Sequence, residues 1–329
     1  MPQNSFPYAS VIVKSRELKI LGKNGIQKLL ASEDARAAAA LLMEWGYGGV
    51  EIESPGEYGR LISREMEEAY DLVCKISPDP ETTDLFFLRH DYHNLKVLLK
   101  AEETGMGANE KNLMKSGTIE LTALLSAVQE KKYGSLTGQM KRALSELDKA
   151  FSVSRDISLI DITLDRAYAE EAAERIRNKP GFIQKYFSLL FDFENLLILL
   201  RAREANLPAG HFSRALLPEG ALGKKELLKA YEAPAGELKS MLARGECAEG
   251  IAAALDAYDS SKNLQMLEKY RDDSLLKTAG AEKNDLFSIA PVVYYLIQKE
   301  REGKAVKMAM TAKLFDLNLD DVQKILVEV

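Results

Sequence analysis

Residues 86–101 read FFLRHDYHNLKVLLKA, and residues 187–202 read FSLLFDFENLLILLRA. Apolar residues recur every three or four positions in both stretches, which is the spacing of one face of an α-helix. Two long helices of closely similar sequence are therefore predicted, 101 residues apart. The identical pairs are Phe86/Phe187, Asp91/Asp192, Asn94/Asn195, Leu95/Leu196, Leu98/Leu199 and Ala101/Ala202.

A third and weaker copy is predicted near the C-terminus, in YYLIQKEREGKAVKMAM over residues 294–310. In this alignment Glu300 takes the Asp position and Gly303 takes the Asn position. Glycine in a helix interior costs about 1 kcal/mol relative to alanine, so we expect the third helix to be weakened at Gly303.

Most of the remaining chain has helical periodicity, interrupted by Gly- and Pro-containing turns and without the alternation expected of strands. The predicted fold class is all-α. A repeat of about a hundred residues is too long for a solenoid and long enough for several helices. We therefore expect three similar multi-helix subdomains, residues 1–105, 106–207 and 208–329, arranged as a funnel around a pseudo-threefold axis.

The repeated Asp-x-x-Asn motif is predicted to be structural. Residues three apart project from the same helix face, so Asp91 and Asn94 share a side, as do Asp192 and Asn195. They lie among leucines that must be buried, and a buried polar group is costly unless it is hydrogen-bonded. We expect each pair, with Glu300 in the third copy, to hold a neighbouring helix end or loop.

Composition narrows the classes of function. A formal net charge of −6, with 29% charged residues, argues against general nucleic-acid binding, which needs a basic face. The two cysteines, Cys74 and Cys247, form no disulfide framework and suit a reducing compartment. No signal peptide is predicted at MPQNSFPYAS, and the longest uncharged stretch, residues 286–298, is too short to span a membrane.

The sequence segments that look like enzymatic motifs lack residues that those motifs require. His90-Asp91 is similar to the dyad of metal phosphohydrolases, but no histidine precedes it, and the second repeat replaces His90 with Phe191. Residues 220–225, GALGKK, lack the spacing of a phosphate-binding loop. We predict no catalytic residues, no metal and no cofactor. A metal phosphohydrolase built on His90-Asp91 remains an alternative, as does a general helical scaffold.

The two repeat helices resemble those of the C subunit of V-type and A-type ATPases, a component of the central stalk that is known as d in the eukaryotic enzyme. Further segments resemble the same family in the same order along almost the whole chain. They are residues 8–17 (YASVIVKSRE), 45–48 (WGYG), 160–166 (IDITLDR), 216–222 (LLPEGAL) and 289–300 (IAPVVYYLIQKE). After Glu300 the sequence departs from the family pattern.

The resemblance implies a non-catalytic rotor subunit. In that family the three-part funnel receives the base of the central shaft and rests on the membrane ring of proteolipid subunits, so that torque passes between ATP hydrolysis or synthesis and ion transport. The expected partners are the shaft subunits and the ring, with no nucleic acid and no functional homo-oligomer. The expected location is the cytoplasmic face of the membrane, peripheral to it through the ring.

Overall fold

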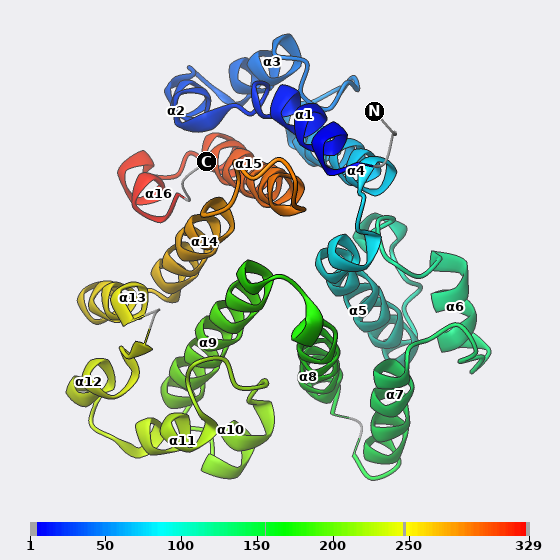
Figure 1. The fold of residues 1–329 in the computed structure, drawn as a ribbon, viewed down its shortest axis with the longest axis vertical. Helices are drawn as coiled ribbons and strands as arrows, with labels where there is room; N and C mark the ends of the chain where they lie inside the picture. The colour runs from blue at the N-terminus through cyan, green and yellow to red at the C-terminus, as the bar shows by residue number, and fades with distance from the viewer. Residues whose placement is uncertain (1–4, 155, 246–247, 327–329) are drawn as a thin grey trace. The chain divides into compact units, whose positions relative to one another are not determined.

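The computed structural model describes residues 5–154, 156–245 and 248–326. It is helical throughout, and its described residues contain no β-strand, which confirms the predicted all-α class. The chain divides into two compact units (Figure 1). Compact unit 1 comprises residues 1–80 and 253–329, and compact unit 2 comprises residues 81–252. The boundary between 252 and 253 falls inside helix α13 (Ala248–Ser261).

Compact unit 1 joins the two ends of the chain. Its central helix is α15 (Ala290–Leu314), and the N-terminal helices α1, α2, α3 and α4 all pack against it. Its core contains Leu42 and Leu61 from the N-terminal part and Val306 and Met310 from α15. The other helices are α1 (Phe6–Glu17), α2 (Gly22–Ala31), α3 (Ala35–Glu44), α4 (Tyr58–Ile76), α14 (Leu264–Gly280) and α16 (Leu319–Ile325), with a 3₁₀ turn η1 (Pro55–Glu57).

Compact unit 2 is built on two long helices, α5 (Pro80–Thr104) and α9 (Gly181–Glu204), which are the two predicted repeat helices. Shorter helices follow each of them in sequence. They are α6 (Leu121–Gln129), α7 (Gly138–Phe151) and α8 (Ser158–Arg175) after α5, and α10 (Ala209–Ala215), α11 (Lys224–Glu232) and α12 (Leu238–Leu242) after α9, with 3₁₀ turns η2 (Glu110–Asn112), η3 (Ile176–Asn178) and η4 (Ala235–Glu237).

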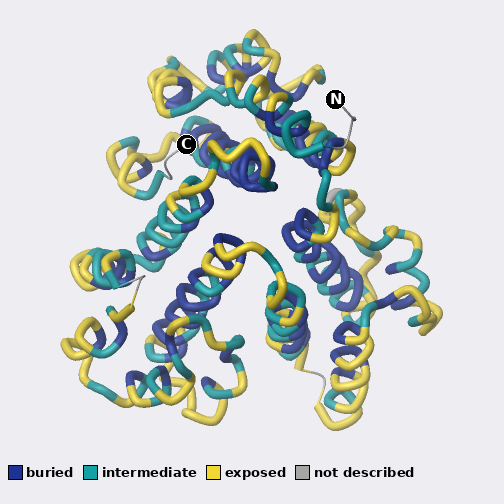
Figure 2. The backbone as a smooth tube through the Cα atoms, in the orientation of Figure 1, coloured by how far each residue is buried: buried dark blue, intermediate teal, exposed yellow. Residues whose placement is uncertain are grey.

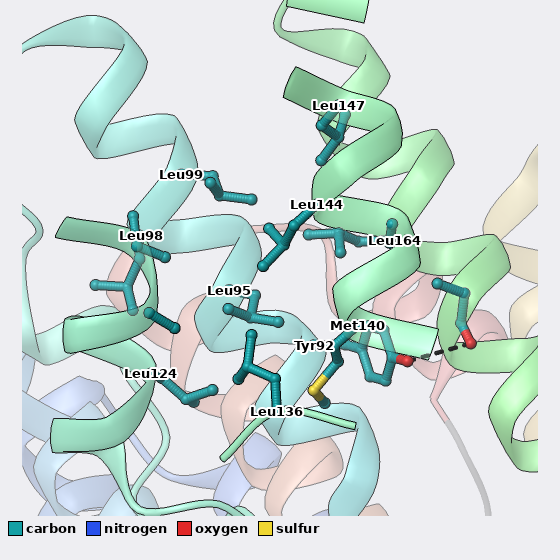
Figure 3. Close-up of a cluster of buried hydrophobic side chains, with 14 of the residues drawn as sticks. Tyr92, Leu95, Leu98, Leu99, Leu124, Leu136, Met140, Leu144, Leu147 and Leu164 are labelled. Atoms are coloured by element: carbon teal, nitrogen blue, oxygen red, sulfur yellow. Dashed lines mark hydrogen bonds between the residues drawn. The ribbon is translucent and has the colours of Figure 1, made fainter. Parts of the chain in front are cut away.

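The core around α5 shows how one repeat is stabilised (Figure 3). Leucines 95, 98 and 99 of α5 pack against Leu144 of α7 and Leu164 of α8. These side chains are almost fully buried, and burying a leucine contributes about 1.5–3 kcal/mol. The Tyr92 hydroxyl at the edge of this core donates a 2.7 Å hydrogen bond to Glu171.

Equivalent residues of the two repeats touch each other. The rings of Phe86 and Phe187 occupy the same repeat position, and their centroids lie 5.5 Å apart in a tilted arrangement that favours aromatic pairs. Tyr186 contacts both rings. The two long helices of compact unit 2 therefore meet through the first residue of the repeated motif.

Much of the burial lies on the long helices α5, α9 and α15, which appear largely dark blue in Figure 2. Among the described residues, no helix is both long enough and apolar enough to cross a lipid bilayer. The division into three subdomains at residues 105 and 207, and the funnel around a pseudo-threefold axis, stay predictions.

Candidate functional site

The Asp91 carboxylate is buried and accepts three hydrogen bonds from one loop. The Thr118 amide donates to Oδ2 at 2.9 Å, the Thr118 hydroxyl to the same oxygen at 2.6 Å, and the Ile119 amide to Oδ1 at 3.2 Å. These residues lead directly into α6, which begins at Leu121. The carboxylate thus fixes the loop at a helix N-terminus, where backbone N–H groups lack partners and negative charge is favoured.

Asn94 binds the same loop one helical turn further along α5. Its amide nitrogen donates to the Met114 carbonyl at 2.8 Å, and its Oδ1 accepts from the Met114 amide, also at 2.8 Å. A side-chain amide is suited to this exchange because it carries both a donor and an acceptor. We call the combined arrangement of Asp, Asn and loop the carboxylate–loop contact.

The second repeat reproduces this contact. Asp192 accepts from the amides of Ala221 and Leu222, both at 2.9 Å, just ahead of α11. Asn195 Oδ1 accepts from the Leu217 amide at 2.8 Å, and its Nδ2 donates to the Pro218 carbonyl at 3.2 Å. Each Asp-x-x-Asn pair therefore joins its long helix to the loop that precedes a shorter helix.

Burial sets the protonation behaviour of both aspartates. Loss of water raises the pKa of each carboxyl above its ordinary value, and the hydrogen bonds from the loop act in the opposite direction. The loop donors favour the ionised form, because a carboxylate accepts hydrogen bonds that a protonated oxygen does not.

Each loop carries a glycine that the sequence analysis did not connect with the Asp-x-x-Asn motif. A Cβ on Gly117 would lie 2.0 Å from Oδ1 of Asp91, and one on Gly220 would lie 2.4 Å from Oδ1 of Asp192. Only glycine permits so close an approach of backbone to carboxylate. These glycines could have been found in the sequence, because each lies one residue before the first backbone amide that donates to the aspartate. Gly117 precedes Thr118, and Gly220 precedes Ala221.

The third long helix, α15, carries its buried acid at Glu302 rather than at the predicted Glu300. Glu302 is fully buried and accepts from the Leu21 amide at 2.6 Å, immediately ahead of α2. Glu300 is only partly buried and accepts from the Tyr70 hydroxyl at 3.3 Å. Residues two apart face different sides of a helix, so only one of them can reach the α2 loop.

Placing Glu302 in the Asp position also aligns the cores. Val306 then corresponds to Leu95 and Met310 to Leu99, and all four are buried, the two leucines in one hydrophobic cluster and the other two residues in another. The Asn position becomes Ala305, which has no amide to offer. Sequence alignment alone missed this register because neither Asn nor a strong leucine pattern marks it.

In α15 a buried ion-pair network takes the place of asparagine. Lys299 donates to Glu302 and lies 2.6 Å from Glu65 of α4. Glu65 in turn accepts from the Gly48 amide at 2.9 Å. Burial lowers the pKa of Lys299, but the carboxylates of Glu302 and Glu65 raise it by a larger amount. The pKa of Lys299 is therefore above its ordinary value, and the ammonium stays charged.

Gly303 does not interrupt the helix, although a weakening was expected at that position. The helix α15 runs from Ala290 to Leu314 without a break. A Cβ on residue 303 would lie 3.1 Å from the sulfur of Met66, so glycine here allows α4 to pack closely against α15.

The two histidines of the repeat hold the same loop as Asp91. His90 Nδ1 lies 3.0 Å from the Ser116 carbonyl, and His93 Nε2 lies 2.9 Å from the Asn112 carbonyl. Burial, with the neighbouring charge of Arg89, lowers the pKa of His90 to about 3. Within the described part of the chain, no three His, Cys, Asp or Glu side chains come together as a metal site would require.

These contacts define a class of all-helical protein in which buried carboxylates on the long helices accept hydrogen bonds from the loops that precede shorter helices. The model of the ATP synthase (C/AC39) subunit family matches residues 9–325, and the chain belongs to this family. The C subunit of the A-type ATP synthase of Methanocaldococcus jannaschii is 22% identical, over 98% of this chain and 86% of that protein.

Two bacterial relatives cover the chain to a similar extent. The C subunit of the V-type sodium ATPase of Enterococcus hirae is 20% identical over 95% of both chains. The C subunit of the V-type ATP synthase of Thermus thermophilus is 24% identical over 94% of both chains. These comparisons confirm the predicted resemblance to the C subunit of V-type and A-type ATPases.

Proposed function

We propose that this chain is the non-catalytic rotor subunit that couples the central shaft to the membrane proteolipid ring. The observation that carries the proposal is its membership of the C/AC39 subunit family over nearly the full chain. In this role the shaft subunits bind one side of the protein and the ring binds another, on the cytoplasmic face of the membrane. Three subdomains around a pseudo-threefold axis would form the funnel that receives the shaft.

The internal contacts suit a part that transmits torque. A rotor element must resist shear, and loops that move freely would absorb it. In α5 and α9 the loops are held by two side chains each, and in α15 the loops at Leu21 and Gly48 are held by an ion-pair network. Buried polar contacts of this kind fix a single arrangement, because leaving any partner unpaired is costly.

The coupling role is tested in the intact complex. Complexes purified with and without this chain are reconstituted into vesicles, and ATP hydrolysis and ATP-driven ion uptake are measured together. We expect the complex lacking the chain to hydrolyse ATP without ion uptake, because the catalytic head turns a shaft that is not joined to the ring. Undiminished uptake without the chain would refute the proposal.

The partners are tested separately. The tagged chain is mixed with the purified shaft subunits and, in a second experiment, with the detergent-solubilised ring. We expect both to be retained, and retention of neither would contradict the assignment of partners. Retention of only one would restrict the proposed role to that side of the rotor.

A further inference from the structure

The corner between α1 and α2 carries an unusual combination of exposed side chains. Arg16, Lys19 and Lys23 are all exposed, and they lie in the sequence on either side of Leu18, whose side chain is 87% exposed. Leu18 follows directly on α1, and α2 begins at Gly22, so the four residues fall between the last turn of α1 and the first turn of α2. An aliphatic side chain this exposed gains little from burial in the folded chain.

The cations at this corner are not neutralised by the protein. Glu17 is the nearest acid in sequence, and it is paired with Lys14 at 3.0 Å. Glu302 lies beneath the corner, but it is buried and holds the Leu21 amide and Lys299. Among the residues that the structure describes, no acid forms an ion pair with Arg16, Lys19 or Lys23.

Charge and shape together select one kind of partner. Exposed cations close in sequence to an exposed aliphatic side chain suit a fluid layer of anionic headgroups, since lysine, which supplies two of the three cations, acts as a movable point charge rather than a fixed fork. Each such cation near an anionic membrane contributes about 1 kcal/mol, and an inserted apolar side chain adds to this. Nucleic acid would use the charges but would leave Leu18 without a role.

We propose that the α1–α2 corner binds anionic lipid headgroups, with Leu18 entering the boundary between headgroups and acyl chains. The inference does not rest on the proposed rotor function, because it follows from this surface alone. If both hold, the corner is a second point of contact with the membrane, beside the proteolipid ring.

The experiment uses the full chain and vesicles of phosphatidylcholine, either pure or with roughly one-third phosphatidylglycerol, in a co-flotation assay. We expect binding to the anionic vesicles only, weakening as salt is added. The triple variant Arg16→Gln/Lys19→Gln/Lys23→Gln should bind roughly 100-fold more weakly, from three charges of about 1 kcal/mol each. Leu18→Ser should bind roughly tenfold more weakly.

The matched control removes three exposed lysines elsewhere, in Lys224→Gln/Lys225→Gln/Lys229→Gln on α11. It changes the net charge equally and should retain binding within about threefold, since it leaves the corner intact. Equal loss in the control, equal binding to neutral vesicles, absence of binding, or equally tight binding to duplex DNA would each overturn the proposal. Because all replaced residues are exposed, unchanged thermal unfolding verifies that the variants are folded.

Discussion

The carboxylate of Asp192 lies so close to the backbone of Gly220 that a Cβ on that residue would stand 2.4 Å from Oδ1. The same imagined atom would lie 2.2 Å from the Ser188 carbonyl oxygen. The loop therefore reaches α9 only because position 220 has no side chain. The contact between Asp91 and Gly117 repeats this relationship in the first copy.

Gly220→Ala is predicted to destabilise compact unit 2 by about 1–3 kcal/mol, the usual cost of forcing an extra methyl group into a packed site. The loop must move away from α9, so the hydrogen bonds from Ala221 and Leu222 to Asp192 lengthen or break. Chemical denaturation gives the stability change, and hydrogen exchange at the Leu222 amide reports the local contact. Gly210→Ala is the control, because a Cβ there meets nothing within 4 Å. Equal stability in the two variants would disprove the close approach.

Asp91→Ala should cost about 1–3 kcal/mol, because the amides of Thr118 and Ile119 lose their acceptor at the edge of the buried helix. Hydrogen exchange should speed up at both amides while the leucine core of α5 stays protected. Glu102→Ala on the same helix serves as the control. Glu102 is exposed and lies 3.9 Å from Lys131 in a long surface ion pair, so its removal should change stability by less than about 0.5 kcal/mol. Unchanged exchange in Asp91→Ala would contradict the role assigned to the carboxylate.

Much of this arrangement could be predicted from the sequence. The helical class and the two long repeat helices follow from apolar periodicity and from identical residues at Asp91/Asp192 and Asn94/Asn195. That these polar residues would bind a nearby loop was expected because a buried carboxylate needs donors. The donors themselves were not identified, because backbone amides carry no signature of their own in a sequence.

The third copy shows where sequence reasoning ends. Glu300 and Glu302 are equally good matches by residue type, and only the fold decides which one faces the α2 loop. The partners of α15 come from the other end of the chain, through Leu21, Gly48 and Glu65. A local alignment cannot reveal contacts between residues so far apart in sequence. The expected weakening at Gly303 stays a prediction, and the sequence did not show that this glycine lets α4 approach closely at Met66.

Lys299→Met is predicted to destabilise compact unit 1 by about 3–5 kcal/mol, the usual cost of removing one partner from a buried ion pair. Glu65 and Glu302 would be left close together without a cation between them. Adding Glu302→Gln should recover part of the loss, because it removes one of the two unpaired charges. Lys324→Met is the control, since Lys324 and Asp321 form an exposed pair. Urea denaturation measures all three variants, and equal effects of Lys299→Met and Lys324→Met would argue against the network.

His90 is predicted to make compact unit 2 sensitive to acid. Its folded-state pKa, about 3, lies below the ordinary value of 6.5, because burial disfavours the charged ring. Between pH 6.5 and pH 3 the His90 ring takes up a proton in the unfolded chain but not in the folded chain. The stability present above pH 6.5 is therefore lost progressively as the pH falls towards 3. The slope is about 1.4 kcal/mol per pH unit, or about 2 kcal/mol between pH 6.5 and pH 5.

His90→Phe isolates this contribution, because the second repeat already holds Phe191 at the equivalent position. At pH 7 the variant should be less stable by about 1 kcal/mol, from the lost hydrogen bond to the Ser116 carbonyl. Its stability should then fall less steeply on acidification, so that the difference from the unaltered chain reverses at about pH 5.7. Denaturation at several pH values measures this, with the exposed His211→Phe as the control. Parallel pH profiles for the unaltered chain and His90→Phe would show that His90 is not the acid-sensitive group.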